Sequence, residues 1–158
     1  MKATRKYAYT GASLFVLYFF QEIFHIKHQW LERWQRQPDY RLATGILLAG
    51  YILLLWQLSI TRMKGEMKKA SASYKWHQRL GALTPLVFFI HSTRMGSAYI
   101  FFLSSVFFGN VLVGILNQET LGFHKRWFYQ GWMVLHVTLS VLVVFIGIYH
   151  IYIVFTYH

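Results

Sequence analysis

The chain has 158 residues, of which 56% are hydrophobic and only 13% charged, with a formal net charge of +11. This balance is typical of a membrane protein and leaves room for a single domain, residues 1–158. Cysteine is absent, which excludes disulfides, iron–sulfur clusters, covalent c-type haem and thiolate zinc sites.

Five apolar segments are predicted to be transmembrane helices, because each approaches the roughly 20 residues that a helix needs to cross a bilayer. They run Tyr7 to Ile26, Leu42 to Ile60, Tyr74 to Met95, Ser97 to Leu116 and Phe128 to Phe155. Only a polar turn around Arg94 and Gly96 separates the third segment from the fourth. The sequence therefore predicts an all-α integral membrane bundle of about five spans.

The connections between these segments are short and basic. Residues 27–41 form an amphipathic stretch that we expect along the membrane interface, and residues 62–75 form a basic loop. With the N-terminus inside, ten cations lie in inner segments: Lys2, Arg5, Lys6, Arg62, Lys64, Lys68, Lys69, Lys75, Lys125 and Arg126. Five lie in outer ones: Lys27, Arg33, Arg36, Arg41 and Arg94. The positive-inside rule then predicts a cytoplasmic N-terminus and an external C-terminus, in a bacterial inner membrane, with the cations contacting anionic lipid rather than nucleic acid.

Four of the eight histidines lie well inside predicted spans, away from their ends, where ionisable residues usually serve a function. They are His77 and His91 in the third span, and His136 and His150 in the fifth, so both pairs are 14 residues apart. Fourteen residues come within about 40° of a whole number of helical turns and rise about 21 Å. Each pair therefore shares one helix face and places one histidine near each membrane surface.

This spacing predicts two b-type haems stacked across the membrane. The third and fifth spans are expected to run parallel, so His77 and His136 would be axial ligands of an inner haem, and His91 and His150 of an outer haem. Neutral imidazole is a good ligand for haem iron. The two irons would lie about 20 Å apart, which permits electron transfer across the bilayer.

Further residues are candidates for contacts with the haems. Small residues on the two histidine faces would leave room for the macrocycles: Gly81, Ser140 and Gly147. Five polar residues near the membrane surfaces are candidates to bind the anionic propionates: Arg79, His124, Lys125 and Arg126 inside, and Arg94 outside.

The run from Trp76 to Gly81, followed by apolar residues to His91, resembles the third span of ferric reductase-like transmembrane domains. The helix from His136 to His150 resembles their fifth span, and the spacing is also similar to that of cytochrome b. The resemblance covers about half of the chain and implies two bis-histidine b haems and electron transfer across the membrane. A sixth span and a flavin or nicotinamide domain, which the family pairs with these helices, are absent from the sequence.

We therefore expect an electron-transfer subunit of an oxidoreductase, with no catalytic residues of its own. It would depend on another redox subunit or on quinone, because no phosphate-binding glycine loop is present. Two alternatives stay open. The same histidines are compatible with chlorophyll binding, or with packing in a structural or assembly subunit of a membrane complex.

Overall fold

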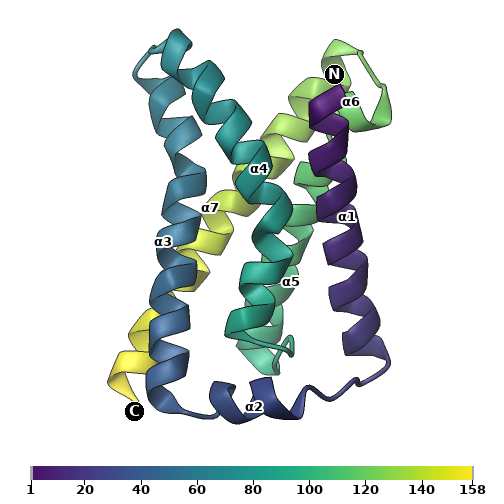
Figure 1. Cartoon of the computed structure of the whole chain (residues 1–158). Helices are drawn as coiled ribbons and strands as arrows, with labels where there is room; N and C mark the ends of the chain where they lie inside the picture. The colour runs from purple at the N-terminus through teal and green to yellow at the C-terminus, as the bar shows by residue number, and fades with distance from the viewer. Residues whose placement is uncertain (1, 158) are drawn as a thin grey trace. The chain divides into compact units, whose positions relative to one another are not determined.

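A computed structural model describes residues 2–157, and within this range the chain is all-helical (Figure 1). Seven helices follow one another: α1 (Lys2–Ile23), α2 (Gln29–Gln35), α3 (Pro38–Met63), α4 (Met67–His91), α5 (Ala98–Ile115), α6 (Gln118–Leu121) and α7 (Arg126–Thr156). They pack as two compact units, residues 2–94 and residues 95–157. The single domain expected from the sequence stays a prediction.

In the first unit, α4 packs between α1 and α3 (Figure 1). Its buried face includes Thr84 and Phe88, which are 3% and 6% exposed. The ring of Tyr18 on α1 meets Phe88 edge to face, with the ring centroids 5.5 Å apart. On the other side, the hydroxyl of Tyr51 on α3 donates a hydrogen bond to the carbonyl of Leu80. Both neighbours therefore hold α4 by specific contacts.

Side chains from outside α4 satisfy the unpaired carbonyls at its C-terminal end. Gln35 on α2 donates through Nε2 to the carbonyls of Phe89 and Ile90, at 3.0 and 3.1 Å. Tyr40 on α3 donates its hydroxyl to Ile90 as well, at 3.0 Å. Just beyond the helix, Gln21 on α1 donates to the carbonyl of Thr93 at 2.8 Å. The last carbonyls of a helix have no partner within it, so these donors fix where α4 ends.

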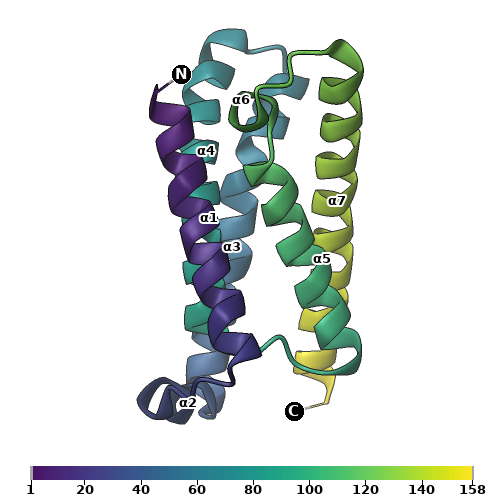
Figure 2. The same cartoon turned by 90° about the vertical axis from the view of Figure 1, so that its right-hand side faces the viewer.

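In the second unit, α5 and α7 run antiparallel to each other (Figure 2). Phe108 and Ser104 on α5 and Val143 on α7 are buried, at 1%, 2% and 5% exposed. Asn110 on α5 donates through Nδ2 to the hydroxyl of Ser140 on α7 at 3.1 Å. A polar pair between two apolar helices fixes their rotation and register.

Three of the described helices are long and apolar enough to cross a membrane: α3, α5 and α7. Large apolar side chains on these helices are exposed by more than half, among them Leu53, Phe102 and Phe145. Length, composition and surface all indicate a membrane location.

The expected count of five spans is corrected to three helices that meet this test. Helices α1 and α4 are long enough, with 22 and 25 residues, yet both carry several charged side chains. In α4 these include Lys68, Lys75 and Arg79. The apolar stretch of each helix is consequently shorter than the helix itself. The prediction from apolar runs did not take these charges into account.

The predicted boundaries differ from the observed ones for a related reason. The break between α4 and α5 falls at residues 92–97, where the polar turn was predicted. By contrast, most of the predicted basic loop is helical, because α3 continues to Met63 and α4 already begins at Met67. Lysine favours helices, so a basic stretch extends a helix rather than ending it.

Candidate functional site

His77 and His91 both contact α3, as expected if they share one face of α4. The Nδ1 atom of His77 lies 3.0 Å from the carbonyl oxygen of Leu55. The Nδ1 atom of His91 lies 3.1 Å from the hydroxyl oxygen of Thr44. Both imidazoles are partly buried. The two contacts anchor each ring to α3 through the same nitrogen.

The partner of His77 defines which nitrogen of that ring carries the proton. A carbonyl only accepts, so His77 donates from Nδ1 to Leu55. The hydroxyl oxygen of Thr44 lies between two groups, 2.8 Å from the carbonyl oxygen of Tyr40 and 3.1 Å from Nδ1 of His91. In a neutral imidazole that donates from Nδ1, as His77 does, the lone pair lies on Nε2.

On α7, both histidines face α5. His136 lies beside Gly114, where an added Cβ would sit 3.3 Å from the Cε1 atom of the ring. Trp132, one turn earlier, stacks on the His136 ring with a centroid distance of 5.5 Å and an angle of 9°. His150 lies near Tyr99, with Nδ1 3.4 Å from the phenolic oxygen. Both rings therefore have defined neighbours on α5 or on α7 itself.

Glycines of α3 and α5 are a feature that the sequence did not single out. A Cβ added at Gly45 would lie 3.4 Å from Cε1 of His91, which mirrors the approach of His136 to Gly114. In each unit a glycine thus lets one imidazole come close to the neighbouring backbone. Glycine is common in membrane helices, so the sequence offered no signal that set these two apart.

The small residues predicted to leave room for haem have different surroundings. An added Cβ at Gly81 or Gly147 would meet nothing within 4 Å. Ser140 is engaged instead, because its hydroxyl lies 2.8 Å from the carbonyl of His136 and pairs with Asn110. Gly81 and Gly147 thus lie on open faces of their helices, whereas Ser140 belongs to the contact between α5 and α7.

Two of the predicted propionate-binding residues have partners within the first unit. Arg79 donates through Nε to the hydroxyl of Tyr7 at 2.9 Å, and its guanidinium lies over the rings of Tyr7 and Trp76. Arg94 forms an ion pair with Glu22 at 3.5 Å. Lys125, Arg126 and His124 are exposed, at and just before the start of α7.

The four histidines thus divide between the two units. His77 and His91 belong to the first unit, and His136 and His150 to the second. Their pairing by level stays a prediction. Within residues 2–157, no three or more histidine or acidic side chains gather into a metal-binding cluster.

Comparison with protein families, with curated proteins and with solved structures finds no match to this chain.

Proposed function

We propose that the chain is a dihaem b-type membrane cytochrome, a subunit that passes electrons across the bilayer between partner proteins or quinone. Two features support the proposal: the doubled 14-residue histidine spacing and the contacts that hold the rings. The observation that carries it is that Nδ1 of both His77 and His91 contacts an oxygen atom of α3. The histidine pattern also resembles that of ferric reductase-like domains and cytochrome b.

The donor chemistry of these residues fits haem. A histidine that coordinates a metal through one nitrogen usually donates the other N–H to a carbonyl, a carboxylate or water. His77 meets this description through Leu55, and Nδ1 of His91 has the hydroxyl of Thr44 as its partner. In the proposal, His77 and His136 hold one haem, and His91 and His150 hold the other. Bound haem would supply reversible one-electron chemistry at iron.

The position of α4 between α1 and α3 supports a place for it at membrane depth. A helix sheltered by two neighbours keeps its polar groups away from lipid and is not required to be apolar on every face. We propose that α3, α5 and α7 cross a bacterial inner membrane, with the N-terminus in the cytoplasm and the C-terminus outside.

A second candidate function is favoured by the same interhelical hydrogen bonds. Histidines that bond a neighbouring helix also occur as packing residues in membrane bundles. In that case the chain is a structural or assembly subunit, and His77 and His91 serve only to join α4 to α3 through their contacts with Leu55 and Thr44. Chlorophyll binding by these histidines is a further alternative.

Two measurements on the purified protein test the proposal. A dithionite-reduced minus oxidised spectrum should give b-type haem bands, whereas chlorophyll bands or a colourless protein would support the alternatives. In sealed vesicles, an impermeant reductant on one side should reduce an impermeant acceptor enclosed on the other. If haem is reduced and the enclosed acceptor never is, the protein is a one-sided quinone-linked cytochrome.

A further inference from the structure

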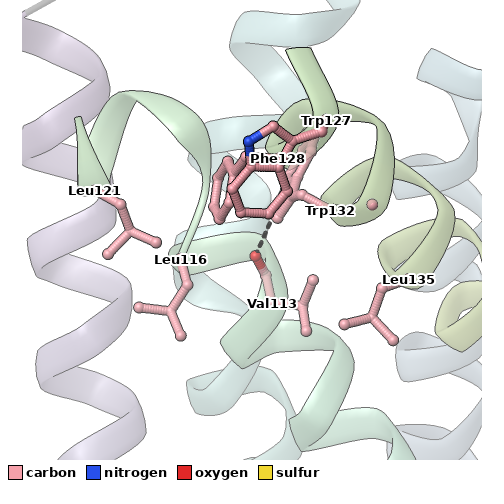
Figure 3. A pocket seen from close by; sticks show the side chains of 8 residues that line it. Val113, Leu116, Leu121, Trp127, Phe128, Trp132 and Leu135 are labelled. Atoms are coloured by element: carbon pink, nitrogen blue, oxygen red, sulfur yellow. Dashed lines mark hydrogen bonds between the residues drawn. The ribbon is translucent and has the colours of Figure 1, made fainter. Parts of the chain in front are cut away.

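The second unit contains an apolar cavity of about 350 Å³ between the C-terminal end of α5, α6 and the first turns of α7 (Figure 3). Its volume lies within the range of about 300–1,000 Å³ typical of small-molecule sites. The labelled side chains converge on it from all three helices: Val113, Leu116, Leu121, Phe128, Trp132 and Leu135. Gly131 also lines the cavity, and no side chain projects into it from this position.

Hydrogen bonds hold the walls of this cavity in place. The indole nitrogen of Trp132 donates to the carbonyl of Val113 at 2.7 Å, which joins α7 to α5 (Figure 3). Asn117 caps α6 by accepting from the backbone N–H groups of Glu119 and Thr120, at 2.9 and 3.1 Å. Gly122 ends α6 in the left-handed conformation, with φ at +72°. These hydrogen bonds and the Gly122 turn fix the conformation of α6, which carries Leu121.

The lining determines the chemistry of an occupant. The lining side chains are aliphatic or aromatic, and the indole N–H of Trp132 is already bonded to Val113. The cavity therefore suits a hydrocarbon chain. An occupant in a membrane would place any polar part outside the cavity.

Positive charge lies beside this cavity, in the residues that precede the lining side chains of α7. Lys125 and Arg126 are exposed and directly precede Trp127 and Phe128, which line the cavity. No side chain caps the N-terminus of α7, and its first turn has no acidic residue. Backbone N–H groups at such a terminus attract anions. Glu119 is the one acidic residue from Asn117 to Leu135.

We propose that this is a binding site for an anionic phospholipid. One acyl chain occupies the cavity, and the phosphate lies at the first turn of α7 with Lys125 and Arg126. A phospholipid joins an apolar chain to an anionic group, which is the combination that the cavity and the adjacent cations present. The proposal is independent of haem binding.

Two variants separate the contributions of the acyl chain and the headgroup. Gly131→Leu adds a bulky side chain at a residue that lines the cavity, and an added Cβ there meets nothing within 4 Å. Its control is Gly50→Leu on α3, where an added Cβ also meets nothing. The double variant Lys125→Gln/Arg126→Gln removes the cations, and Lys68→Gln/Lys69→Gln, at exposed positions of α4, is its control.

Native mass spectrometry of the purified protein, titrated with phosphatidylglycerol or with phosphatidylcholine of the same acyl chains, measures both contributions. We expect the wild type to prefer phosphatidylglycerol by about tenfold or more, since each cation near a membrane surface favours anionic lipid. Gly131→Leu should weaken the binding of both lipids, and the Lys125→Gln/Arg126→Gln variant should abolish the preference for phosphatidylglycerol. Both controls should match the wild type.

Three results would overturn the proposal. The first is equal binding of the two lipids by the wild type. This comparison needs no variant, so it tests the proposal even if a variant fails to fold. The second is unchanged lipid binding by Gly131→Leu, or the finding that this variant loses a bound isoprenoid quinone and keeps the phospholipid. The third is a loss of haem, with unchanged lipid binding, in the Lys125→Gln/Arg126→Gln variant, which would assign these cations to haem propionates.

Discussion

At the scale of single residues, the hydroxyl of Thr44 connects the backbone of α3 to the ring of His91. It donates to the carbonyl of Tyr40 and hydrogen-bonds Nδ1 of His91. The two contacts hold the orientation of the ring. If Nε2 of His91 coordinates iron, Thr44 is a positioning residue for the ligand.

Replacing Thr44 by valine keeps the shape of the side chain and removes the hydroxyl that bonds His91. We expect Thr44→Val to weaken binding of one of the two haems by about 10–100-fold, which is the usual effect of losing such a partner. Haem titration of the purified apoprotein measures it. Thr10→Val is the matched control, because the Thr10 hydroxyl also bonds a carbonyl four residues earlier, on the exposed part of α1. Equal haem affinity in Thr44→Val and in the wild type would contradict this role.

The sequence could predict which histidines share a face, but not the groups that hold them. The 14-residue spacing determines the relative direction of His77 and His91 whatever surrounds α4. The partners Leu55 and Thr44 depend on how α3 is rotated and shifted against α4, which periodicity does not determine. For Leu55 the acceptor is a backbone carbonyl, which no residue type reveals.

At the scale of helices, α4 depends on its neighbours for its C-terminal end. Gln35 satisfies the Phe89 and Ile90 carbonyls, and its side-chain oxygen accepts from both the backbone and the hydroxyl of Thr93. The polar turn that begins there was predictable from its composition. The role of α2 was not, because the amphipathic pattern of residues 27–41 predicts an interfacial segment without naming its partner.

We expect Gln35→Leu to destabilise the protein by about 1–3 kcal/mol, because it removes the side-chain donor to the Phe89 carbonyl and the acceptor of the Thr93 N–H, whereas Tyr40 still bonds Ile90. The thermal midpoint of the purified protein in detergent measures the change. Gln29→Leu, at an exposed position of the same short helix, should leave the midpoint close to that of the wild type. A midpoint of Gln35→Leu equal to that of the control would mean that these bonds contribute nothing to stability.

The pairing of histidines tests the relation between α4 and α7. If the two helices run parallel in the membrane, His77→Ala and His136→Ala should remove the same haem, and His91→Ala and His150→Ala the other. Spectra and redox titration of the four variants distinguish the two haems by their bands and potentials. Loss of one common haem in His77→Ala and His150→Ala would mean that the helices are antiparallel.

At the scale of the whole molecule, the distribution of cations predicts the direction of insertion. The five segments predicted from the sequence put ten cations on the cytoplasmic side and five on the other, with Arg79 left out of the count. Reporter fusions at the two ends, one active only in the cytoplasm and one only outside, should place the N-terminus inside and the C-terminus outside. Both ends on one side would require an even number of crossings and would contradict this topology.

The number of haems per chain tests the central proposal most directly, because it depends on all four histidines at once. A pyridine haemochrome assay on the purified protein, with the protein quantified independently, measures this ratio. We expect about two b haems per chain in the wild type and about one in each single histidine variant, since each haem requires both of its imidazoles. A ratio near zero in the wild type would contradict the assignment of these histidines as haem ligands.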